Sequence, residues 1–117
     1  KGEGVSTQVA PRVFHELQQM TDAAFVQQLV DTFLEDVPVQ VNSMQAALAA
    51  RSPVDFQRAA HSVKSNAATF GASRLAELAR ELEQMGMENR LEEAPERLQE
   101  LESLFRSVAG ELKELCQ

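Results

Sequence analysis

One stretch of the chain combines residue types that could act as a nucleophile with a counter-charge. Residues 61–72 read His-Ser-Val-Lys-Ser-Asn-Ala-Ala-Thr-Phe-Gly-Ala. On a helix, Lys64 and Ser65 lie three and four residues beyond His61 and therefore neighbour it directly. A neutral imidazole nitrogen can attack phosphorus or another electrophile. A nearby ammonium group can offset the charge of a transferred phosphoryl group.

The helical pattern around His61 places it on the solvent side. The apolar positions at helical spacing are Phe56, Ala60, Val63, Ala67 and Phe70. At 100° per residue, His61 lies roughly 140° from this stripe. Gln57, Ser65 and Ala68 share its side, and the last two are small enough to let a large partner approach closely. We therefore predict a docking surface formed by these three residues around His61.

Two interpretations of Glu83 stay open, a hydrogen-bonding partner of the imidazole and an ordinary surface charge. Ala72 lies at the centre of the predicted turn, and His61 and Glu83 are each eleven residues from it. Residues equidistant from the turn of an antiparallel helical pair face each other. A carboxylate there would accept a hydrogen bond from Nδ1–H and leave Nε2 free to attack.

The remaining composition limits the function classes. The chain has 117 residues, enough for one domain, and a net charge of −7 without clustered Lys and Arg. These features argue against nucleic acid and anionic membranes as partners. The chain has a single cysteine, Cys116, which excludes an intramolecular disulfide and fits a reducing compartment. It has no apolar run of about 18 residues, the length that a membrane-spanning helix needs. We expect a cytoplasmic, monomeric protein whose missing active-site groups come from a partner.

The first half of the chain predicts two helices after a short tail. Residues 1–8 are small and polar, and we interpret them as a flexible tail or linker before a domain at 9–117. The start at Lys1 favours a piece of a longer protein. A short helix is predicted over Pro11–Met20, with Thr21 as the N-cap of the next. That second helix carries its apolar stripe from Val26 to Leu48 through Pro38, which predicts one long kinked helix.

The second half predicts three more helices. The third covers about Pro53–Thr69 and stops at Gly71. The fourth covers about Ser73–Met85 and ends at Gly86, and the last runs from about Ala94 to Leu115. No segment alternates with the period of a strand. The prediction is an all-α fold, an antiparallel four-helix bundle with a short extra N-terminal helix.

At this point the sequence resembles the histidine-containing phosphotransfer (HPt) domain of two-component phosphorelays. The motif residues that carry the resemblance are His61, Lys64, Ser65, Ala67, Phe70, Gly71 and Ala72. The preceding Arg58-Ala59-Ala60 and the segment Phe33-Leu34-Glu35-Asp36-Val37-Pro38 also look like the family. The resemblance covers about residues 10–115.

The resemblance implies a role for each matching residue. His61 would be phosphorylated at Nε2, Lys64 would neutralise the phosphoryl group, and Glu83 matches a family position from which Gln or Glu supports the imidazole. The residue after the lysine is commonly Gly in the family, and here it is Ser65. Such a domain would accept its phosphoryl group from a phospho-aspartate receiver domain and pass it to another receiver. It would bind no cofactor itself, because the receiver supplies Mg²⁺.

Three alternatives remain open. The chain could be a non-catalytic helical interaction module. It could be the substrate domain of a sensor histidine kinase, phosphorylated directly by the ATP-binding domain. It could also be an enzyme that uses His61 as a base, although no second catalytic group supports this hypothesis.

Several other residues have structural interpretations. His15 has plain polar neighbours, and we assign it no role. Asn66 lies closer to the core, and we predict that its side chain forms a hydrogen bond between helices. For Phe14, Phe25 and Phe70 the core is the favoured position, with an exposed docking patch as the alternative for one of them.

Overall fold

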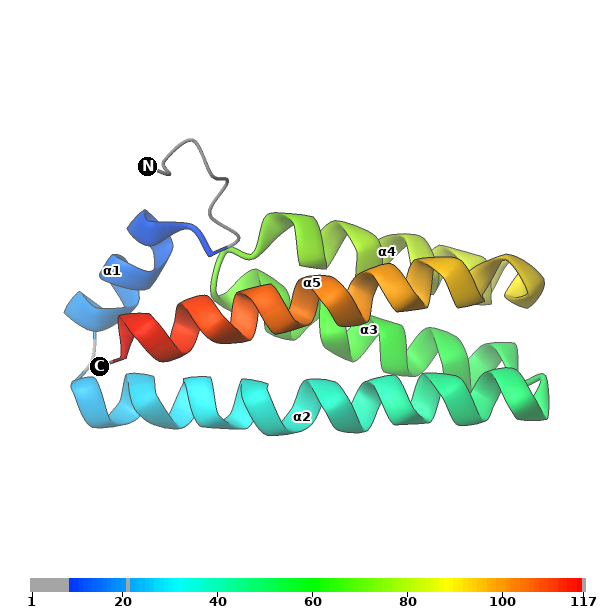
Figure 1. Cartoon of the computed structure of the whole chain (residues 1–117), viewed down its shortest axis with the longest axis horizontal. Helices are drawn as coiled ribbons and strands as arrows, with labels where there is room; N and C mark the ends of the chain where they lie inside the picture. The colour runs from blue at the N-terminus through cyan, green and yellow to red at the C-terminus, as the bar shows by residue number, and fades with distance from the viewer. Residues whose placement is uncertain (1–8, 21, 117) are drawn as a thin grey trace.

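The computed structural model describes residues 9–20 and 22–116, whose regular elements are all helical. The elements are α1 (Pro11–Met20), α2 (Ala23–Ala50), α3 (Pro53–Thr69), α4 (Ser73–Met87), the 3-10 turn η1 (Leu91–Glu93) and α5 (Ala94–Leu115). Helices α2 to α5 run antiparallel along one axis, and α1 lies at the end where α2 begins and α5 finishes (Figure 1). The predicted all-α four-helix bundle with a short extra helix is confirmed. The predicted tail at residues 1–8 lies outside the described residues.

Side-chain caps fix where α2 and α3 begin. Asp22 caps α2, because its carboxylate accepts a hydrogen bond of 2.8 Å from the Phe25 N–H. Thr21, the predicted cap, lies outside the described residues. Ser52 caps α3, because its hydroxyl accepts from the Asp55 N–H at 3.4 Å. The sequence therefore places the start of α3 correctly, and with it the position of His61, eight residues after Pro53.

Helix α2 continues through Pro38 as one element of 28 residues. Val37 and Val41, on either side of the proline, are both buried. The apolar stripe thus keeps its phase across the proline, and the prediction of one long helix is confirmed. A kink at Pro38 stays a prediction.

The core lies between the four long helices and is closed at one end by α1. Its largest fully buried side chains include Phe14, Met44, Phe56, Phe70, Leu75, Leu78, Leu82, Leu101 and Leu112. The Phe33 ring meets the Phe70 ring edge-on at a centroid distance of 5.3 Å, which joins α2 to the end of α3. No described polar or charged residue is buried. None of the described helices combines the length and the apolar character that crossing a membrane requires.

Of the three phenylalanines considered for the core, Phe25 is the one that lies outside it. It is exposed, whereas Phe14 and Phe70 are buried as predicted. The buried stripe of α2 begins one residue later, at Val26. Since adjacent helical residues point about 100° apart, Phe25 falls off the stripe.

Gly86 does not end the fourth helix, so that prediction is wrong. Helix α4 continues to Met87, and Gly86 is buried within it. A Cβ at this position would lie 2.9 Å from the Gln57 Cβ and 3.0 Å from the Pro53 carbonyl oxygen. The glycine therefore serves close packing of α4 against the first turns of α3, rather than chain termination.

Gly71 connects α3 to α4 with a left-handed backbone, at φ +67°. A Cβ here would lie 2.8 Å from the Ala10 Cβ. We expect Gly71→Ala to lower the free energy of unfolding by about 2–4 kcal/mol, because backbone strain and overpacking add. Gly110→Ala is the control: Gly110 is an exposed helical glycine with open space around its Cα, and we expect a gain of up to about 1 kcal/mol. Urea denaturation of both variants measures this, and equal effects would contradict the packing argument.

Candidate functional site

Helix α3 presents His61 to solvent while its opposite side is packed. It packs most extensively on α4 and next on α2, through a buried face that includes Phe56, Val63 and Ala67. The side chain of His61 is 56% exposed. The predicted docking residues surround it: Ser65 and Ala68 are exposed and Gln57 is half-buried. The described structure thus leaves the imidazole accessible to a large partner.

The carboxylate of Glu83 on α4 contacts both the imidazole of His61 and the ammonium group of Lys64. Its Oε2 lies 2.8 Å from Nδ1 of His61, and its Oε1 lies 2.8 Å from Nζ of Lys64. The Glu83 side chain is only 12% exposed, so α3 and α4 cover it. The contact between Glu83 and the imidazole agrees with the geometry predicted from the turn.

The ion pair between Lys64 and Glu83 was missed by sequence reasoning. A usable signal exists in hindsight: Lys64 is one turn beyond His61 on the face that meets α4. Any α4 residue that reaches the imidazole is then also within reach of a long lysine side chain. The structure therefore unites His61, Lys64 and Glu83 in one cluster.

Glu83 is an anion at neutral pH. Partial burial raises the pKa of this carboxyl, but hydrogen bonds from Lys64 and His61, together with their charges, outweigh burial and leave the pKa below its ordinary value of 4.5. An ionised carboxylate can only accept hydrogen bonds. A neutral His61 must therefore carry its proton on Nδ1, with the lone pair of Nε2 available for attack.

The lowered pKa of Glu83 predicts a pH-dependent contribution to stability. The ionised form is favoured in the folded state, so its contribution is complete above pH 4.5 and is lost as the pH falls through the lower folded-state pKa. We expect the difference in the free energy of unfolding between wild type and Glu83→Gln to be largest above pH 4.5 and to vanish in stronger acid. Urea denaturation from pH 7 to pH 3 measures it. A difference that stays constant over this range would contradict the assignment.

A hydrogen bond also links α3 to α2, on the flank of α3 away from Glu83. Asn66 Nδ2 donates to Oδ2 of Asp36 on α2 at 2.7 Å. The predicted inter-helix role of Asn66 is therefore confirmed. Together with the Glu83 contacts on the other flank, this bond holds His61 pointing outward between α2 and α4.

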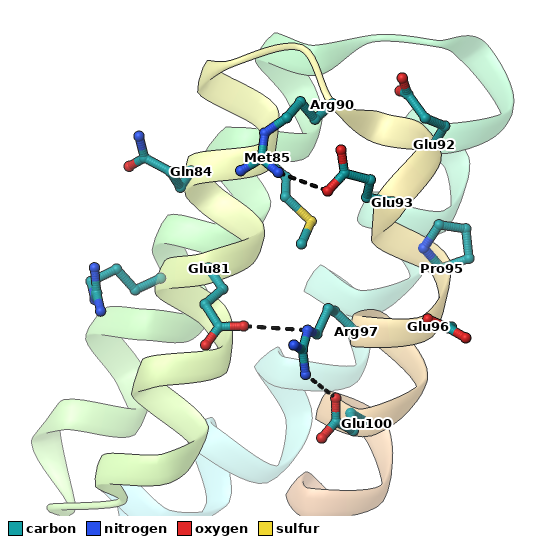
Figure 2. A pocket seen from close by; sticks show the side chains of 11 residues that line it. Glu81, Gln84, Met85, Arg90, Glu92, Glu93, Pro95, Glu96, Arg97 and Glu100 are labelled. Carbon is teal, nitrogen blue, oxygen red and sulfur yellow. Dashed lines mark hydrogen bonds and ion pairs between the residues drawn. The ribbon is translucent and has the colours of Figure 1, made fainter.

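The remaining candidate features lie away from this cluster. His15 is exposed on α1, at the end of the bundle. The described residues hold no group of three or more His, Cys, Asp or Glu side chains that could bind a metal ion. A groove of about 620 Å³ between α4 and the start of α5 is lined by ion pairs, including Arg97 with Glu81 at 3.4 Å and Arg90 with Glu93 at 2.7 Å (Figure 2). It does not include His61.

The comparisons with known proteins agree with this geometry. A family model described as Hpt domain matches residues 28–117. The crystal structure of histidine-containing phosphotransfer protein B (HptB) from Pseudomonas aeruginosa PAO1 matches with a TM-score of 0.89 and 29% sequence identity, over 96% of each chain. A search of curated protein sequences found no match. The chain, with its helical bundle and exposed histidine, belongs to the Hpt domain family, the histidine phosphocarriers of two-component phosphorelays.

Proposed function

We propose that this chain carries a phosphoryl group on Nε2 of His61. It accepts the group from the phospho-aspartate of a receiver domain and passes it to the aspartate of another receiver. The observation that supports this most strongly is the 2.8 Å contact between Nδ1 of His61 and the ionised Glu83, with the imidazole exposed. This arrangement leaves the second ring nitrogen as a nucleophile directed to solvent.

The proposed transfer balances without a base on this chain. The Nε2 lone pair attacks phosphorus, the bond between phosphorus and the aspartate oxygen breaks, and the aspartate leaves as a carboxylate. The ring keeps its Nδ1 proton and gains a positive charge as the N–P bond forms. Glu83, which accepts the Nδ1–H hydrogen bond, stabilises this developing charge. The reverse reaction delivers the group to the next receiver.

Lys64 supplies positive charge on the same face. Its ammonium lies 2.8 Å from Glu83 and one helical turn from His61. In the proposed phosphorylated state, it offsets the negative charge of the phosphoryl oxygens. Ser65 and Ala68 keep the approach to Nε2 open because their side chains are small.

Receiver domains are the proposed partners, with a sensor histidine kinase as a further donor, and no nucleic acid or membrane is involved. We expect the receiver to hold the Mg²⁺ and this chain to need no cofactor. We expect the domain to act as a cytoplasmic monomer, as a carrier rather than a classical enzyme.

The test is a transfer assay with a panel of receiver domains charged with radiolabelled phosphate in the presence of Mg²⁺. We expect rapid transfer to this chain from at least one receiver, with a label that acid removes and base does not, and onward transfer to a second receiver. Failure of every charged receiver to transfer, while a histidine kinase with ATP labels the chain, would overturn the receiver-to-receiver proposal. Failure of both donors would leave a binding module and overturn the carrier role.

A further inference from the structure

Arg80 on α4 is an exposed cation that has no partner among the described residues. The groove between α4 and the start of α5 contains two more arginines, Arg90 and Arg97, and glutamates hold both of them (Figure 2). Arg80 lines the same groove, yet no described carboxylate lies within ion-pair distance of its guanidinium. Its charge is therefore available to another group.

Arg80 lies beside Glu83 and level with Lys64. It precedes Glu83 by three residues on α4, a spacing at which helical side chains neighbour each other. Lys64 and Arg80 are each eight residues from the centre of the turn at Ala72. His61 and Glu83 are equidistant from the same centre, and their 2.8 Å contact shows that this register holds. Lys64 from α3 and Arg80 from α4 therefore flank the Glu83 carboxylate.

Phosphorylation of His61 changes the charge balance of this cluster. With His61 neutral, the Lys64 ammonium group is balanced by the Glu83 carboxylate, 2.8 Å away. A phosphoryl group brings up to about two negative charges, whereas the ring gains only a single positive charge. Lys64 then has to serve both the phosphoryl group and Glu83. Arg58, three residues before His61, is already in contact with Asp55 at 3.7 Å. The phosphorylated cluster therefore requires a further cation.

Two carboxylates on α4 neighbour Arg80, and that of Glu83 is the less exposed. Glu77 precedes Arg80 by three residues and Glu83 follows it by three. The Glu77 side chain is 58% exposed and already lies 3.9 Å from Arg74, whereas the Glu83 side chain is 12% exposed. Because water screens an ion pair less at a covered position, Arg80 gains more from pairing with Glu83 than with Glu77.

We propose that Arg80 takes over the Glu83 carboxylate from Lys64 when His61 is phosphorylated. Lys64 turns its ammonium group to the phosphoryl oxygens, and the Arg80 guanidinium replaces it at Oε1 of Glu83. Oε2 keeps its contact with Nδ1–H of the ring. This inference rests on the proposed function, because it takes His61 as the phosphorylated residue. It makes Arg80 a positioning residue, which acts through Lys64 and Glu83 and not on phosphorus.

The equilibrium constant for transfer from a charged receiver to the chain tests this exchange of cations. The constant compares the free phosphorylated and unphosphorylated proteins, so the way in which the receiver docks does not affect it. We expect Arg80→Gln to lower the constant about threefold to tenfold, because the ion pair at Oε1 is lost only in the phosphorylated state. Arg80→Lys should keep the wild-type constant. The control is Arg74→Gln, which removes the same charge from an exposed position of the same helix and should leave the constant unchanged.

A double-mutant cycle separates the exchange from direct contact with the phosphoryl group. In the Lys64→Gln background, Arg80 can pair with Glu83 before and after phosphorylation, so Arg80→Gln should leave the constant nearly unchanged there. The same fold loss in both backgrounds would mean that Arg80 contacts the phosphoryl group itself, and would overturn the exchange. An unchanged constant for Arg80→Gln, with wild type active, would overturn the exchange alone. Absence of transfer from every receiver to wild type would overturn the proposed function itself.

Discussion

Replacing His61 by glutamine is expected to abolish phosphoryl transfer to this chain, and replacing His15 by glutamine should leave transfer intact. These are the two histidines of the chain. Glutamine fills a similar volume but offers no nucleophilic ring nitrogen. His15 lies on α1, outside the cluster that Glu83 organises. The measurement is the initial rate of label transfer from a charged receiver to each variant.

The loss should come from chemistry rather than from unfolding. His61 is more than half exposed, and substitutions at exposed positions usually change stability by less than about 0.5 kcal/mol. Circular dichroism and urea denaturation of His61→Gln should therefore match wild type closely. A folded His61→Gln variant that still takes up label, or a His15→Gln variant that loses it, would show that His61 is not the carrier.

Replacing Glu83 by alanine should lower the rate of phosphoryl transfer by about 10- to 100-fold. The estimate follows from losing one hydrogen bond to a charged group, worth about 1.5–3 kcal/mol, from the transition state. The carboxylate orders the Nδ1–H tautomer and opposes the positive charge that develops on the ring. It also holds Lys64 beside the site. The measurement is kcat/KM for transfer from a receiver.

Two further α4 variants separate the roles of Glu83. Glu83→Gln keeps an oxygen that can accept from Nδ1–H but removes the charge, so its rate should fall between wild type and Glu83→Ala. Glu77→Ala, at an exposed position of the same helix, should change the rate less than twofold. Equal rates for Glu83→Ala and Glu77→Ala would mean that the 2.8 Å contact with the imidazole does not assist transfer.

The local signals in the sequence predicted most helix boundaries but not the packing between helices. Pro53 after Ser52 marks the start of α3, and both residues act locally on the backbone. The prediction that Gly86 ends the fourth helix was wrong, because the role of this glycine depends on packing between helices and not on a local signal. A glycine after an apolar residue is typical of a helix end, but here the absent side chain serves the approach of α3, which no local pattern reveals.

The candidate site was predictable where it depended on one helix or on turn symmetry. The spacing of His61 and Lys64 places them together on any helix. The equal distance of His61 and Glu83 from the turn anticipated their contact. The ion pair between Lys64 and the Glu83 carboxylate depends on how closely α3 and α4 approach each other. This ion pair therefore did not follow from spacing alone.

The most direct test of the central claim is to locate the phosphorus by NMR. The chain would be labelled with ¹⁵N in its histidine rings and phosphorylated by a charged receiver. The account predicts that phosphorus couples to Nε2 of His61 and that Nδ1 keeps its proton in a hydrogen bond to Glu83. Phosphorus on Nδ1, on His15 or on a carboxylate would contradict it.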